Sequence, residues 1–236
     1  MDRIPPKPSS PHESRATSFL RPAVFGASDG LVSNLALVMG VAGASSDHQA
    51  IVVAGIAGLL AGAFSMAVGE YISVRSQHEL FEAQRRLEER QLEQDEAGER
   101  AILVGIYQAR GFSADEARAI VDTLFATPDR ALASMMRDEV GLDPRAIGGP
   151  WAAASSSFAA FVAGAIIPLL PFLLLTGTPA LVGSVLVSLV ALFMLGLGVS
   201  RLTGRPPIIC GLRQMALGGV AALVTYIIGQ AIGTAV

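Results

Sequence analysis

Residues from Trp151 to Ser200 include no Asp, Glu, Lys or Arg. A stretch this long holds two helical crossings of a bilayer, because one crossing needs about 20 predominantly apolar residues. Only 16% of the whole chain is charged, against about 25% in a typical soluble domain. The sequence therefore predicts an all-α integral membrane protein.

Five apolar segments can be recognised, at about 23–44, 50–74, 151–175, 179–200 and 208–234. A polar insert over 76–149 separates the second segment from the third, and it holds 15 of the 20 acidic residues. Its abundance of strong helix formers favours helices. The predicted fold is thus five transmembrane helices with a cytoplasmic helical insert between the second and third.

The basic residues of the connections predict the orientation of the chain. They occur in the N-terminal tail, after the second apolar segment and between the fourth and fifth, and they are missing from the other connections. Because basic loops stay in the cytoplasm, we expect the N-terminus and the insert inside and the C-terminus outside. The expected domains are a disordered cytoplasmic tail (1–22), transmembrane helices 1 and 2 (23–75), the cytoplasmic helical domain (76–149) and transmembrane helices 3 to 5 (150–236).

Local signals divide the insert into three or four helices, the first continuing the second transmembrane helix. Ser113 with Glu116 three residues later is a capping-box pattern. Gly111 suits the end of the preceding helix. Pro128 suits a first helical turn, and Gly141 the end of that last helix.

Pairs of glycines four residues apart recur in the apolar segments. This spacing lets helix backbones approach closely in lipid. The pairs are Gly26 and Gly30, Gly58 and Gly62, and Gly229 and Gly233. We expect them to serve helix packing.

Two carboxylates, Asp29 and Glu70, are the only acidic residues within the apolar segments. Ionisable side chains at membrane depth are costly and usually mark ion or proton pathways. Glu70 lies near Arg75, so an interfacial role explains it equally well. Met66 precedes Glu70 by one helical turn, and a thioether beside a carboxylate suits a borderline divalent transition metal. Taken alone, a methionine here would be a packing residue.

The insert carries further acidic side chains at helical spacings. Its candidate metal ligands are Glu88, Glu89, Glu96, Glu99, Met135 and Glu139. Met135 and Glu139 are four residues apart and therefore project from one face. A simply solvated, charged helix is the competing interpretation for the glutamates.

Other function classes find little support. The net charge of −3 and the lack of a basic cluster argue against nucleic acid as a partner. No nucleophile–base pair or nucleotide-binding motif occurs, so we expect neither an enzyme nor a prosthetic group. The single cysteine, Cys210, is expected to pack as a small apolar residue.

Several stretches together resemble the vacuolar iron transporter family. They read GASDGLVSNLALVMGVAGA, GLLAGAFSMAVGEYISVRSQ, MMRDEVGL, GAIIPLLPFLL and GLRQMALGGVAALVTYIIG. The resemblance implies a homodimer in membrane lipid, with a translocation path at the dimer interface lined by the first two helices. It also implies export of Fe²⁺ or Mn²⁺ from the cytosol in exchange for protons.

The resemblance also assigns individual residues. In the membrane, Asp29, Met66 and Glu70 match the family's aspartate, methionine and glutamate. In the insert, which would bind metal, the matching residues are Glu88, Glu99, Met135 and Glu139. The sequence departs from the family at Ile102 and Gly105, where carboxylates are expected. Glu89 and Glu96 are candidates to replace them.

Two alternatives stay open at the level of sequence. One is a membrane scaffold whose acidic insert recruits a cytosolic partner. The other, a proton-coupled carrier of an organic solute, fits poorly because the third and fourth segments lack charged residues and the fifth has only Arg213. Sequence leaves the choice between Fe²⁺ and Mn²⁺, the proton stoichiometry and the host organism open. The membrane would be the cell membrane in a bacterium and the vacuolar membrane in a eukaryote.

Overall fold

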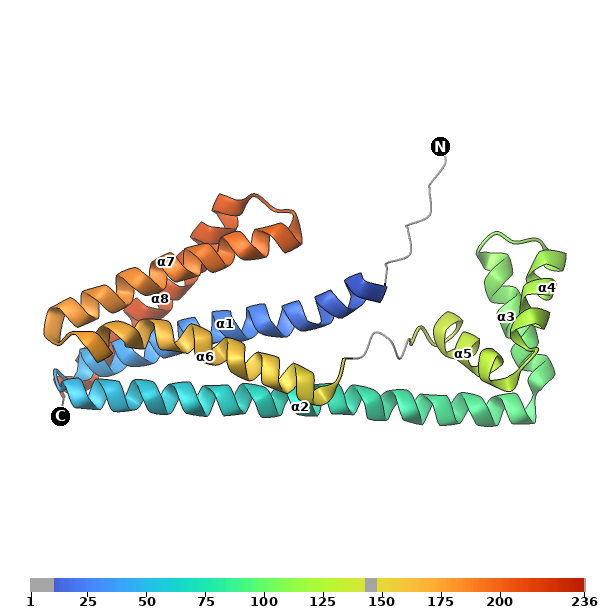
Figure 1. The fold of residues 1–236 in the computed structure, drawn as a ribbon, viewed down its shortest axis with the longest axis horizontal. Coiled ribbons are helices and arrows are strands. Elements are labelled where there is room, and N and C mark those ends of the chain that lie inside the picture. The colour runs from blue at the N-terminus through green and yellow to red at the C-terminus, as the bar shows by residue number, and fades with distance from the viewer. Residues whose placement is uncertain (1–10, 143–147, 236) are drawn as a thin grey trace. The chain divides into compact units, whose positions relative to one another are not determined.

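A computed structural model of the chain describes residues 11–142 and 148–235, which form eight α-helices and no strand (Figure 1). The helices are α1 (Pro11–Ala44), α2 (His48–Gln94), α3 (Glu96–Ala109), α4 (Ala114–Leu124), α5 (Pro128–Asp138), α6 (Pro150–Leu174), α7 (Gly177–Thr203) and α8 (Pro207–Gly233). The predicted all-α class is confirmed.

The N-terminal tail was expected to be disordered over residues 1–22. Residues 1–10 lie outside the described part of the chain, whereas residues 11–22 belong to α1. The fixed φ of Pro11 is compatible with a first helical turn. Helix α1 therefore begins before the apolar span, which starts at Ala23, and the domain boundary at residue 22 stays a prediction.

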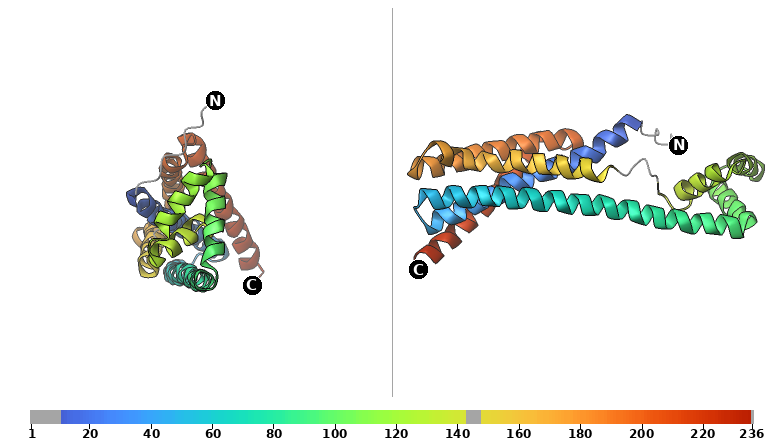
Figure 2. Two further views of the ribbon diagram at one scale, coloured as in Figure 1. Left: turned by 90° about the vertical axis from the view of Figure 1, so that its right-hand side faces the viewer. Right: turned by 60° about the horizontal axis from the view of Figure 1, so that its bottom comes forward.

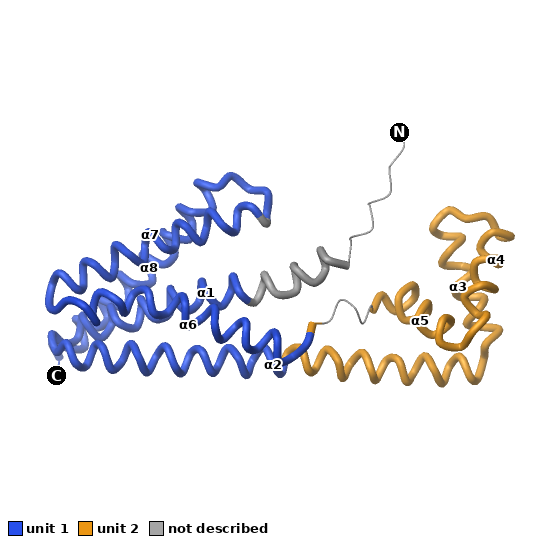
Figure 3. The backbone as a smooth tube through the Cα atoms, viewed as in Figure 1, with its two compact units in different colours: residues 1–72, 149–236 blue, residues 73–148 orange. Residues whose placement is uncertain are grey.

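The chain divides into two compact units, drawn in different colours in Figure 3. The first unit consists of residues 1–72 and 149–236, and the second of residues 73–148. Helix α2 contributes its first part to the first unit and its last part to the second. At about 1.5 Å per residue its 47 residues span roughly 70 Å, more than twice a hydrocarbon core of about 30 Å. Its polar last part therefore extends into water.

Five helices are long and apolar enough to cross a membrane: α1 from Ala23, α2, α6, α7 to Arg201, and α8. This confirms the number of apolar segments predicted from the sequence. Between 17% and 39% of the most apolar window of each helix is buried within the protein. Many large apolar side chains consequently face outward, as lipid-facing helices require.

Helix α1 is the centre of the first unit, where it packs against α6, α7 and α8 (Figure 2). Its core side chains Leu35, Val38 and Met39 are buried against Leu169 and Phe172 of α6. These apolar contacts hold the middle of α1, and glycines permit the close approach of its neighbours.

The predicted close helix contacts are present at both ends of the α1 span. A Cβ on Gly30 would overlap the carbonyl oxygen of Phe161, and one on Gly164 would overlap that of Ala27. Towards the other end, a Cβ on Gly229 would overlap the carbonyl oxygen of Gly40. Here the backbones of α1, α6 and α8 touch directly, so no larger residue fits without separating the helices.

The second unit has the helix boundaries that the local signals predicted. Ser113 forms a complete capping box with Glu116 at the start of α4. Pro128 begins α5. Gly111 and Gly141 follow helix ends with φ of 102° and 73°, a conformation that favours glycine.

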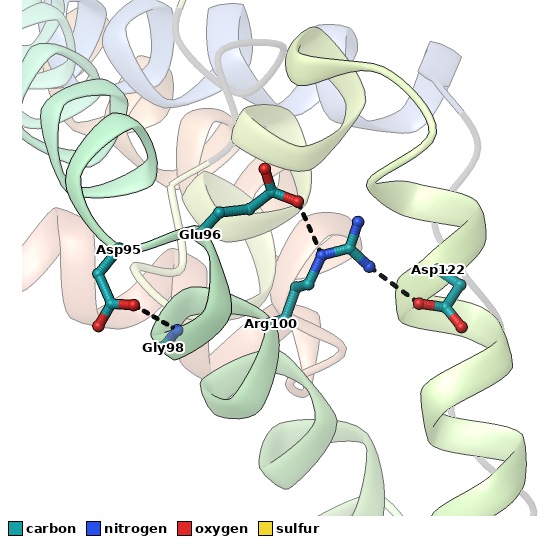
Figure 4. A network of polar contacts seen from close by, with 5 residues as sticks. All are labelled: Asp95, Glu96, Gly98, Arg100 and Asp122. Carbon is teal, nitrogen blue, oxygen red and sulfur yellow. Dashed lines mark hydrogen bonds and ion pairs between the residues drawn. The ribbon is translucent and has the colours of Figure 1, made fainter.

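Polar contacts and a small core hold α3, α4 and α5 together. Arg100 of α3 donates to Glu96 at 2.9 Å and to Asp122 of α4 at 2.9 Å, as Figure 4 shows. Arg110 of α3 pairs with Asp138 of α5 at 2.7 Å. The buried side chains of this core are Leu103, Val121 and Met135.

We predict that Gly164→Ala lowers the unfolding temperature of the purified protein in detergent. The added methyl group overlaps backbone on α1, and overpacking of this kind costs about 1–3 kcal/mol. The matched control is Gly198→Ala on α7, where nothing lies within 4 Å of the new Cβ. Equal unfolding temperatures for the two variants would contradict the backbone contact between α1 and α6.

Candidate metal sites

A cavity of about 450 Å³ lies in the first unit between α1 and α2. Its lining consists of Phe25, Asp29, Ser33, Asn34, Leu37, Gly58, Gly62, Ser65, Met66, Gly69, Glu70 and Phe161. Both carboxylates of the apolar segments are among these residues, and no Lys or Arg is. The cavity therefore favours a cation.

Asp29 reaches the cavity from α1, where it is half-buried. One turn later, the Ser33 hydroxyl donates to the backbone carbonyl of Asp29 at 2.6 Å rather than to its carboxylate. The flanking Gly26 and Gly30 are in contact with α6. These contacts fix the helical turn that carries the Asp29 side chain.

Met66 and Glu70 lie one turn apart on α2 and line the same cavity. The sequence left open whether Glu70 serves Arg75 at an interface. In the structure Arg75 donates instead to Glu79 at 2.9 Å. Met66 also packs against the apolar cluster of Ala63, Phe161 and Ala165, so it has a packing role beside any role in the cavity.

A group of three carboxylates lies in the second unit. One oxygen from each of Glu88, Glu99 and Glu139 lies within 4.8 Å of the others. Glu88 comes from α2, Glu99 from α3, and Glu139 directly follows α5. Glu88 and Glu99 are only 4% and 7% exposed. We call Glu88, Glu99 and Glu139 the carboxylate cluster.

Charge within the carboxylate cluster is poorly compensated by the protein. Burial raises the pKa of the Glu99 carboxyl, and the charges of Glu88 and Asp95 raise it further. Loss of hydration raises the pKa of Glu139, with Glu88 and Glu99 adding to the effect. Glu88 accepts a hydrogen bond from Gln84 at 2.8 Å. Among the described residues, however, the buried Oε2 of Glu99 has no hydrogen-bond partner.

Arg100, which adjoins Glu99 in sequence, is engaged elsewhere. It pairs with Glu96 and Asp122. A buried charge without a partner is costly. A divalent cation, held by three carboxylates, would supply the missing positive charge.

The other predicted ligands of the insert have different surroundings. Glu89 is exposed on α2. Glu96 lies in the first turn of α3 and pairs with Arg100 (Figure 4). Met135 is fully buried in the apolar core, one turn before Glu139. Ile102 and Gly105, where the family resemblance leads us to expect carboxylates, are both exposed.

Three polar residues of the cavity were not singled out from the sequence: Ser33, Asn34 and Ser65. Serines are common in membrane helices, so neither serine stood out. The available signal was Asn34, an amide in an otherwise apolar run shortly after Asp29. It indicates polarity but not the direction in which the side chain faces.

The chain is similar to known proteins over most of its length. The chain is 33% identical over 220 residues to a vacuolar iron transporter 1 of Oryza sativa subsp. japonica, covering 91% of this chain and 86% of that protein. It is 30% identical over 221 residues to vacuolar iron transporter 1 of Arabidopsis thaliana, covering 92% and 87%. A vacuolar iron transporter of Plasmodium falciparum is 31% identical over 223 residues, covering 89% and 81%.

These relatives are named as transporters, in agreement with the expectation that the chain is not an enzyme. The family model described as the VIT family matches residues 20–230, which include both sites. The resemblance inferred from the sequence motifs is thereby confirmed, and the chain belongs to the VIT family.

Proposed function

We propose that this protein is a divalent transition-metal transporter that moves Fe²⁺ out of the cytosol. The observation that carries the proposal is the cavity in which Asp29 of α1 meets Met66 and Glu70 of α2. The iron transporters among its relatives support Fe²⁺ as the cargo. Mn²⁺ is a second candidate cargo, because mixed carboxylate and thioether ligands suit both ions.

A cation that enters the cavity loses water ligands, and the cavity offers oxygen ligands to replace them. Two carboxylates balance the charge of a divalent ion, and the Met66 thioether favours transition metals over Na⁺ or Ca²⁺. Asp29 would bind either the metal or a proton. The two ions then exclude each other at Asp29, which is the requirement for proton antiport.

A second copy of the chain would complete the path. In a two-fold dimer each ligand occurs twice, so two copies of Asp29 and Met66 could surround one ion. Helix α2 has an apolar stripe suited to such a contact. Each of its large apolar side chains is between 43% and 60% exposed, and they are Val53, Ile56, Leu60, Phe64, Val68 and Ile72. Lipid would cover whatever part of this stripe the partner leaves free.

The proposed orientation places the N-terminus and the second unit in the cytoplasm and the C-terminus outside. It follows from the basic residues of alternate connections. The relatives' names support a vacuolar membrane in a eukaryotic host. With the second unit in the cytoplasm, the carboxylate cluster would capture metal before it enters the cavity.

We predict that Asp29→Asn strongly slows proton-driven Fe²⁺ transport by the full-length protein in proteoliposomes. The substitution keeps the side-chain shape but removes the charge that binds both metal and proton. Loss of one charged ligand should slow transport by at least about tenfold, the factor that corresponds to about 1.4 kcal/mol.

The matched control for this experiment is Asp47→Asn. Asp47 is exposed in the connection between α1 and α2, outside the cavity. It should transport Fe²⁺ at the wild-type rate. Normal transport by the Asp29 variant would refute the mechanism, and lack of transport by the wild type would favour the membrane scaffold instead.

We also predict that Mn²⁺ binds to the full-length protein in detergent more tightly at pH 7 than at pH 5. The raised pKa values of Glu99 and Glu139 mean that both carboxyls keep their protons to a higher pH than an ordinary glutamate. Metal must displace those protons, so its affinity rises as the pH rises through this range. Isothermal titration calorimetry in two buffers of different ionisation enthalpy would measure both affinity and proton release.

Glu99→Gln should weaken this binding by about tenfold or more, equivalent to about 1.4 kcal/mol. Glu89→Gln is the control, since Glu89 is exposed and outside the carboxylate cluster. Equal affinities for the two variants would show that the carboxylate cluster is not the capture site.

A further inference from the structure

Asn34 is a buried amide in the wall of the Asp29 cavity, only 2% exposed. Its Nδ2 donates to the backbone carbonyl of Ala165 on α6 at 2.6 Å. Only the NH₂ group of an amide can face a carbonyl oxygen. This hydrogen bond therefore fixes which way the amide is turned, with Oδ1 directed away from Ala165.

The Asn34 Oδ1 atom is buried and has no hydrogen-bond partner among the described residues. It lies 3.1 Å from the place that a Cβ on Gly58 would occupy, so it faces α2. Gly58 also lines the cavity. Leaving a buried acceptor unpaired costs free energy, and a bound ion is one partner that removes this cost.

The position of Asn34 along α1 indicates what could bind to this oxygen. Asn34 follows Asp29 by five residues, or about 7.5 Å along the helix. Its neighbours at this end of the cavity, Leu37 and Gly58, are apolar. The amide oxygen is therefore a polar group between apolar residues, and a cation that has moved beyond Asp29 would reach it.

We propose that Asn34 Oδ1 is a ligand for the dehydrated divalent metal ion beyond Asp29. The inference rests on the transport function proposed above. An amide oxygen is a neutral, hard ligand of the kind that binds divalent cations. The amide is neutral and does not take up a proton at physiological pH. It thus offers the ion an oxygen ligand after the ion leaves Asp29.

Three variants of the full-length protein test the proposal by Fe²⁺ uptake into proteoliposomes. Asn34→Leu removes both the oxygen and the NH₂ group. Asn34→Asp removes the donor to Ala165 but keeps an oxygen at the site. Ser188→Ala is the control, because the Ser188 hydroxyl is likewise buried and unpaired among the described residues but does not line the cavity.

If Asn34 is a ligand, Asn34→Leu should slow uptake at subsaturating Fe²⁺ by about tenfold. Its unfolding temperature should stay near that of the wild type. Asn34→Asp should bind the ion more tightly, with a lower KM than the wild type and a lower maximal rate, since release from a carboxylate is slower. Ser188→Ala should transport normally. The effect on KM separates the ligand role from a packing role, because a lost hydrogen bond to Ala165 affects both Asn34 variants alike.

Uptake by Asn34→Leu at the rate of the wild type would overturn the inference and leave the proposed function intact. A failure of Asn34→Leu to fold, or an equal loss of uptake in both Asn34 variants with unchanged KM, would assign Asn34 to packing and also overturn it. If the wild type moved no metal, both proposals would fall together.

Discussion

The direct backbone contact of α1 with α6 and α8 is the interaction on which the first unit depends. Within lipid, apolar burial gives little preference for one helix arrangement over another, so close packing must select it. Gly30 and Gly164 allow α1 and α6 to touch, and Gly229 does the same for α8 against α1. Because α1 also carries Asp29, the contacts that set the fold also set the position of the carboxylate.

The side of α1 that faces α2 is built differently. There, a Cβ on Gly58 would meet the Leu37 side chain of α1, and one on Gly62 would meet the Phe161 side chain of α6. Side chains, and not backbone, thus face α2, and the cavity occupies the space beside them. Tight contact on one side of α1 and a cavity on the other give a polar site with rigid support, which suits a path for ions.

The two carboxylate sites differ in how far their carboxylates are buried. In the first unit, Asp29 and Glu70 line an open cavity beside a thioether. In the second, Glu88 and Glu99 are buried next to an apolar core, with their arginine neighbours paired elsewhere. The first arrangement leaves space beside its carboxylates, whereas the second encloses two of its three. This difference is consistent with the capture and transport proposed above.

The sequence by itself determined the helical class, the five apolar spans and the helix boundaries of the insert. These depend on local chemistry: hydropathy over a span, the capping box of Ser113 and Glu116, and glycine after a helix end. It also singled out Asp29, Met66 and Glu70 as candidates, the two carboxylates because charges are conspicuous in apolar segments and Met66 because it lies one turn from Glu70. The polar composition of residues 11–22 gave no sign that α1 begins at Pro11.

Only the tertiary structure decided which candidate side chains meet. Glu88 and Glu89 are adjacent in sequence, yet burial against α3 and α5 selects Glu88 and leaves Glu89 in solvent. Glu96 was a candidate ligand like Glu99, but its carboxylate pairs with Arg100. Arg100 in turn also pairs with Asp122. The direction of the Asn34 amide likewise depends on a carbonyl of α6 that is distant in sequence. Helical spacing defines the face of one helix, whereas the partner of that face is set by the packing of all the others.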